Sequence, residues 1–325
     1  MADQPHYFHA EAHALSGRID LPFKQDIKKQ AFVKLEGRLA DLTEEQRAQR
    51  NYFSQHAKNF RLEGIISYSA AHTQVSGHES RKFPGASVTL ATSLVEDLNI
   101  LNVVTADRIV AQVSTTHFPN VYAPRVTFLG THFEGLRIAR HKVEPFLNLG
   151  LVGKEPGGKS LYVEAKTFVT AVKSQYKNLK EWVKGLEGEL RTARSGADDG
   201  SLRTQYHWGD PKYDQIKEEA IDAREEDLKT GRGKSSGITC SLVEDIEIEP
   251  IKGPSGESEF EQLTKRKCGH VIHVPDFGTI FLAELTVKHD TFHLSMIRVE
   301  MGCLASGSST AGACTVNGGG KPPAP

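Results

Sequence analysis

The sequence predicts an α+β protein, mainly β, in which an antiparallel sandwich or barrel-like sheet is interrupted by a charged helical insertion. Residues 85–152 contain ten charged side chains in 68 positions and many β-branched and apolar residues, which favours strands. Residues 160–232 contain 27 charged side chains in 73 positions, with apolar residues at helical spacing. Strand character returns after residue 237.

The composition is typical of an ordinary globular protein. The chain has 325 residues, 38% apolar and 25% charged, with a formal net charge of -1, so disorder, collagen and a small disulfide scaffold are excluded. Balanced charge predicts neither nucleic acid nor an anionic membrane as a partner. No apolar run approaches the roughly 20 residues of a membrane span, and the start of the chain lacks a secretory signal. We therefore expect no membrane span and, by default, a cytoplasmic location.

Turn residues punctuate the first β-rich segment at regular intervals, as in an antiparallel sheet. They are Pro119-Asn120, Ala123-Pro124, Gly130, Gly135 and Pro145. A later run, 271–299, predicts three consecutive antiparallel strands, and an earlier strand is expected around 14–21. The residues 305–325 are rich in Gly, Ser and Pro, which predicts a flexible tail.

The helical insertion begins with an apolar stripe in steps of three and four, formed by Val169, Val172, Tyr176, Leu179, Val183, Leu186 and Leu190. The stripe either docks on the protein's own sheet or forms a self-associating coiled coil. A second helix is expected over 211–229. The economical organisation is one β-rich domain made of 6–152 together with 237–304, interrupted by the insertion 160–232; two independent domains are the alternative.

Residues 153–160 match the phosphate-loop pattern G-x-x-x-x-G-K-[ST]. Gly153 and Gly158 are its glycines, Lys159 would neutralise phosphates and the Ser160 hydroxyl would bind Mg²⁺. Loops of this class follow strands of a parallel sheet, whereas the strands here are predicted to be antiparallel. No unbroken apolar run ending in a magnesium-binding Asp follows. We favour a glycine-rich entry to the insertion, with a Mg-nucleotide site as the alternative.

Two pairs among the fourteen histidines have a spacing that could bind a transition metal. His9 and His13 share one face of a strand or a helix, and His289 and His293 share a strand face unless the chain turns between them. No third ligand has a diagnostic position, and the H-E-x-x-H signature is absent. We predict no cofactor and keep a metal-dependent enzyme as an alternative.

Other catalytic and metal-binding signatures are missing. No G-x-S-x-G motif appears, so an α/β-hydrolase is unsupported. The cysteines occur singly, which disfavours a zinc ribbon and predicts buried thiols; they are Cys240, Cys268, Cys303 and Cys314.

Three strand segments resemble the β-rich bacterial proteins called choice-of-anchor P. They are residues 94–111 (LVEDLNILNVVTADRIVA), 128–138 (FLGTHFEGLRI) and 277–285 (FGTIFLAEL). That class is named for variable surface-sorting ends, so the resemblance implies a β-rich bacterial protein and surface association. It implies no catalytic residues. The sequence departs from the class because it shows neither an export signal nor a sorting tail.

Together these observations favour a non-enzymatic β-rich structural or interaction protein that self-associates or binds a protein partner. Strand content, the incomplete catalytic signatures and the long apolar stripe support it. The alternatives are a nucleotide-binding protein that uses residues 153–160 and a metal-dependent enzyme that uses histidines.

Overall fold

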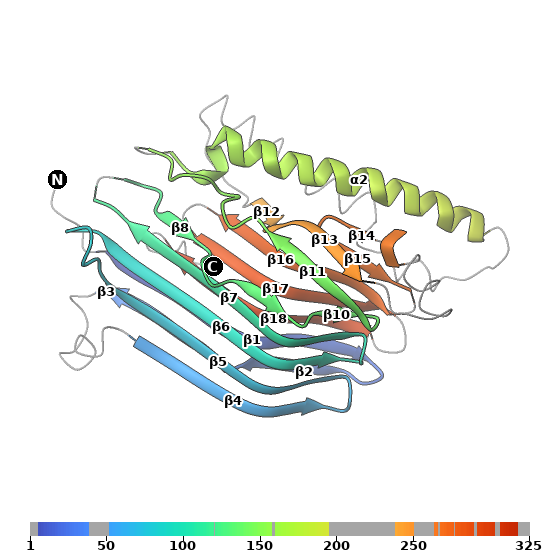
Figure 1. The fold of residues 1–325 in the computed structure, drawn as a ribbon. Helices are drawn as coiled ribbons and strands as arrows, with labels where there is room; N and C mark the ends of the chain where they lie inside the picture. Colours follow the sequence, from blue (N-terminus) through green and yellow to red (C-terminus); the bar gives the residue numbers. More distant parts are fainter. Residues whose placement is uncertain are drawn as a thin grey trace.

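Two antiparallel sheets of nine strands each form the body of the molecule, and one long helix lies against their edges (Figure 1). The computed structural model describes residues 6–38, 52–119, 121–157, 160–194, 238–249, 263–265, 267–275, 277–288, 291–302 and 306–317. Neither sheet closes on itself. Every recorded strand pair is antiparallel, so the mainly β fold class is confirmed, and the layers stack as an open sandwich.

Sheet B has the strand order β13-β11-β10-β7-β6-β5-β4, with β8 and β9 also paired to β7. Its long strands alternate buried and solvent-facing side chains, as the sequence pattern requires. The bounds are β4 (Tyr52–Leu62), β5 (Ile66–Glu79), β6 (Ser87–Ile100), β7 (Val104–His117), β8 (Arg125–Thr127), β9 (His132–Glu134), β10 (Arg137–Ile138), β11 (His141–Leu147) and β13 (Val243–Glu249).

Sheet A has the order β14-β15-β16-β17-β18-β1-β2, with β12 on β16 and β3 on β1. It contains the predicted meander as β15, β16 and β17. Both sheets combine strands from before and after the helical insertion. The bounds are β1 (Tyr7–Leu21), β2 (Gln25–Gln30), β3 (Val33–Arg38), β12 (Ile238–Ser241), β14 (Lys267–Cys268), β15 (Val271–Val274), β16 (Gly278–Lys288), β17 (Thr291–Gly302) and β18 (Ser306–Asn317).

Strand β18 corrects the predicted flexible tail. It lies between β17 and β1 in the middle of sheet A and pairs with both along most of its length. Its small residues fit a crowded position: a Cβ atom on Gly307 would lie 2.1 Å from the Arg18 carbonyl oxygen. The Gly and Ser content of this segment reflects tight packing, although the same composition is typical of disordered chain.

Two long strands of sheet B bend at matching register positions, where each has one residue in the left-handed conformation. Asn59 of β4 and Asp97 of β6 have φ angles of 54° and 52°, and the register places Ser69 of β5 between them. The alternation of buried and exposed residues shifts there, since Val95 and Leu98 are both buried. The inner face of the sheet therefore stays apolar on both sides of the bend.

Sheet A repeats this arrangement. Ala283 of β16 and Gly312 of β18 have φ angles of 47° and 63°, and Met296 of β17 lies between them in register. The long strands of both layers consequently bend together, as Figure 1 shows.

Helix α2 (Lys166–Arg194) follows a short 3-10 helix (Tyr162–Glu164) and docks on the sandwich. Of the predicted apolar stripe, Val169, Val172 and Leu179 are buried. The first two join the main core, and Leu179 contacts a small cluster that includes Val271 and Phe281 of sheet A. This part of the stripe packs on the protein's own sheet. The side chains beyond residue 182 and the predicted helix over 211–229 lie outside the described residues.

Candidate functional site

The described part of the phosphate-loop segment has the geometry of a connector. The strand before it, β11, is paired antiparallel to β10 and β13, and α2 begins only at Lys166. In a phosphate loop the helix starts at the lysine and serine of the motif. Gly153 has a positive φ in a turn, and Ser160 is exposed. Gly158 and Lys159 lie outside the described residues. The described residues of the segment lead from β11 to the 3-10 helix before α2.

The structure does not bring the two predicted histidine pairs together as metal ligands among the described residues. His9 and His13 both lie on β1, where His9 faces Glu11 at 3.8 Å and the His13 ring hydrogen-bonds the Ser16 hydroxyl at 3.0 Å. The chain turns between Lys288 and Thr291, which pair with each other. The sequence predicts that His289 and His293 share a strand face only if the chain does not turn between them, and this prediction is therefore wrong. His289 itself lies outside the described residues.

His13 and His293, from different predicted pairs, are neighbours on the outer face of sheet A. Burial, together with the positive charges of Lys29 and His293, lowers the pKa of His13 to about 4. Burial also lowers the pKa of His293, whose ring nitrogens lie at hydrogen-bond distance from Thr315 and Ser295. In the described part of the chain, no group of three or more His, Cys, Asp or Glu residues is arranged to hold a metal ion.

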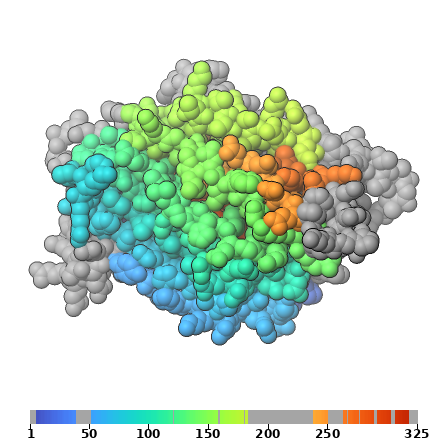
Figure 2. All heavy atoms as spheres, in the orientation of Figure 1, coloured from blue at the N-terminus to red at the C-terminus, as the bar shows by residue number. Residues whose placement is uncertain are grey.

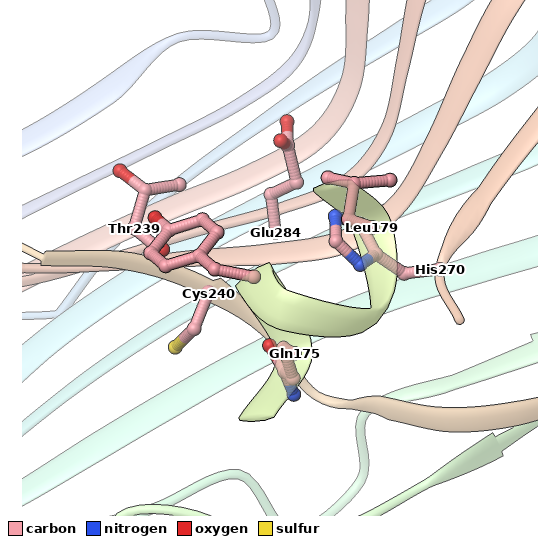
Figure 3. Close-up of a pocket in the computed structure, with 7 residues that line it drawn as sticks. Gln175, Leu179, Thr239, Cys240, His270 and Glu284 are labelled. Atoms are coloured by element: carbon pink, nitrogen blue, oxygen red, sulfur yellow. Dashed lines mark hydrogen bonds between the residues drawn. The ribbon is translucent and has the colours of Figure 1, made fainter. Parts of the chain in front are cut away.

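Helix α2 seals the edge of β12. The side-chain amide of Gln175 donates to the Ser241 carbonyl at 2.9 Å and accepts from the Ser241 N–H at 3.1 Å, as a neighbouring strand would. The Tyr176 hydroxyl donates to the Thr239 carbonyl. Figure 3 shows these side chains around a small hollow that Leu179, Cys240, His270 and Glu284 also line. The hollow has room for about one water molecule.

The charged groups beside this hollow are engaged in an ion-pair cluster. Arg298 of β17 binds Glu284 through two hydrogen bonds, of 2.5 and 2.9 Å, and also binds Glu300. Its guanidinium lies 3.7 Å from the centre of the Phe281 ring. Burial raises the pKa of the Cys240 thiol, which holds that group in its unreactive protonated form. The cluster is typical of a structural support that fixes α2 on sheet A.

Replacing Gln175 by Ala is expected to lower the free energy of unfolding by about 1 to 3 kcal/mol. The variant leaves the N–H and C=O of the buried Ser241 without their partner, and unsatisfied buried groups are costly. Urea unfolding measures the change. Lys177→Ala is the matched control on the same helix, because that side chain is 76% exposed. An equal effect in the two variants would mean that Gln175 does not seal the edge.

A histidine pair that the sequence analysis did not find lies on the outer face of sheet B. His56 of β4 and His72 of β5 are directly opposite in the register, with ring centres 4.2 Å apart. The two residues are sixteen positions apart in the sequence, so only the strand register brings them together. A hairpin predicted with the right register would have revealed the pair.

The sheet edges differ in how they are covered. At β13, the backbone of Ile246 binds two side chains, because its N–H donates to Asp245 at 2.7 Å and its carbonyl accepts from Lys267. At β12, Gln175 and Tyr176 take this role. Strand β4 ends sheet B, and its only strand partner among the described residues is β5. Figure 2 shows the blue atoms of this region at the lower surface of the molecule.

The fold and these surfaces define a two-layer antiparallel β-protein with a helix closing one end. The chain belongs to a protein family described as a domain of unknown function (DUF8256), whose model matches residues 6–288. No curated protein and no solved structure matches the chain. None of the described helices has the length and apolar character needed to cross a bilayer.

Proposed function

We propose that this protein is a non-enzymatic structural or interaction protein that self-associates by pairing strand β4 of two copies edge to edge. The main support for the proposal is the position of β4 at the edge of sheet B. It is an eleven-residue strand at the end of sheet B, and such edges present rows of N–H and C=O groups that can pair with another strand.

The contrast with the other edges supports this choice. Side chains bind outward backbone groups of Thr239 and Ser241 in β12 and of Ile246 in β13. Strand β2 is only six residues long, and short edge strands offer little backbone for pairing. Among the described residues, no side chain hydrogen-bonds the backbone of β4 in this way.

The charges along β4 fit antiparallel self-pairing. Residues 52–57 contain no Lys, Arg, Asp or Glu, and the basic residues Lys58 and Arg61 follow. A pairing centred on His56 places Lys58 of each copy opposite Ser54 of the other. The basic half of each strand then faces the uncharged half of its partner, and like charges do not meet. The result is a two-fold dimer with one continuous sheet.

Light scattering after size-exclusion chromatography over a range of concentrations tests the proposal. We expect a dimer that dissociates on dilution. Ser54→Lys sets two like charges opposite each other in each half of the interface and is expected to weaken the dimer about five-fold. Ser54→Glu, the matched variant, is expected to strengthen it by a similar factor.

Two results would overturn the proposal. The first is a monomer at every concentration. The second is a dimer whose dissociation constant is the same in wild type, Ser54→Lys and Ser54→Glu, since its interface would then lie elsewhere.

A further inference from the structure

The two imidazole rings on β4 and β5 lie at ligand spacing. The Nδ1 atom of His72 is 3.2 Å from Nδ1 and 3.1 Å from Nε2 of His56. His56 is exposed and His72 is half-buried, and both point away from the core on the outer face of sheet B. Their strands are fixed by a register that continues on both sides of the pair, from Tyr52 opposite Ser76 to Lys58 opposite Ala70.

We infer that His56 and His72 form a binding site for a divalent transition-metal ion of the kind that prefers imidazole, namely Cu²⁺, Ni²⁺ or Zn²⁺. Two nitrogen ligands at 2.0 to 2.1 Å from a tetrahedral ion lie about 3.3 Å apart, close to the spacing in the structure. The exposed His56 ring needs only a rotation about its side-chain bonds to direct a nitrogen lone pair at the same point as His72.

The surroundings of the pair agree with this role. His72 forms a side-chain hydrogen bond with Gln74, its neighbour on the same strand face. A hydrogen bond of this kind orients a metal-binding imidazole. The protein supplies two ligands, and water occupies the remaining positions of the ion.

The inference does not rest on self-association, because both ligands belong to one chain. The site would take one ion per chain, and Cu²⁺ would bind more tightly than Ni²⁺ or Zn²⁺, in the usual order for nitrogen ligands. Binding would weaken in acid, because protonated imidazole cannot bind a metal.

Isothermal titration of the full-length protein with CuCl₂ and with ZnCl₂ tests the site. We expect His56→Ala and His72→Ala each to weaken binding about ten-fold or more. His132→Ala is the matched control, because His132 is an exposed histidine on β9 of the same sheet and should leave binding unchanged. Electron paramagnetic resonance of the Cu²⁺ form should show two nitrogen ligands in wild type and fewer in either variant.

The same titration with Ser54→Lys separates this inference from the proposed dimer, since a variant with a weakened dimer should still bind one ion per chain with the wild-type affinity. Equal affinities in wild type, His56→Ala and His72→Ala would overturn the inference, as would a loss of binding only in His132→Ala. Thermal unfolding of each variant without metal checks that the substitutions leave the fold intact.

Discussion

A chain that ends at Gly302 is expected not to fold. Such a deletion removes β18 from the middle of sheet A and leaves β17 and β1 without the strand that joins them. It also removes Ala311, Cys314 and Val316 from the core, where each is at most 1% exposed. The lost hydrogen bonds and apolar contacts exceed the roughly 5 to 15 kcal/mol that stabilise a typical domain.

Circular dichroism and the soluble yield of the shortened protein measure this effect. A chain that ends at Asn317 keeps all of β18 and is the control; it should fold like the full-length protein. A chain ending at Gly302 that unfolds cooperatively with an unchanged urea midpoint would contradict the placement of β18 in the sheet.

Acid is expected to destabilise the protein before most carboxylates titrate. Burial lowers the pKa of His13 to about 4, helped by the nearby Lys29 and His293 and opposed by Glu11. Burial and His117 lower the pKa of His6 to about 4. The unfolded chain takes up these protons near pH 6.5, the folded chain only near pH 4, so stability falls as the pH drops through this window. For each of these two histidines, the free energy of unfolding falls by about 2 kcal/mol between pH 7 and pH 5.

Urea unfolding at pH 7 and at pH 5 measures the difference. In His13→Gln, the drop in the free energy of unfolding between pH 7 and pH 5 should be smaller than in wild type by about 2 kcal/mol, because glutamine does not titrate. His132→Gln is the control for the substitution itself, since His132 is exposed. A His13→Gln protein with the wild-type pH dependence would show that His13 does not contribute to it.

Much of the fold could be predicted because local patterns report local structure. The alternation around Ile109 and Val113 predicts one buried face on β7, and both side chains are fully buried. The stripe from Val169 to Leu179 predicts a docked helix face for the same reason. Such patterns arise because one face of each strand or helix is buried, whichever element covers that face. They can therefore be recognised within a single segment of the sequence.

The misses have a different cause, because they depend on which distant segments become neighbours. Composition alone makes Gly307 look like part of a flexible tail, yet its lack of a side chain lets β18 approach the backbone of β1. His56 and His72 form a pair only through the register of β4 and β5, and the ion pair of Glu284 with Arg298 only through that of β16 and β17. The spacing of His9 and His13 contains no such information.

The bend that crosses both layers restricts how relatives of this chain can differ in length. Asn59 and Asp97 sit level with each other in sheet B, as Ala283 and Gly312 do in sheet A, so an inserted residue in one strand would move its left-handed position out of line with the others in its sheet. We expect relatives to add or lose residues in the connections, or in two paired strands at once. The distance from each hairpin to the bend should therefore be the same throughout the family.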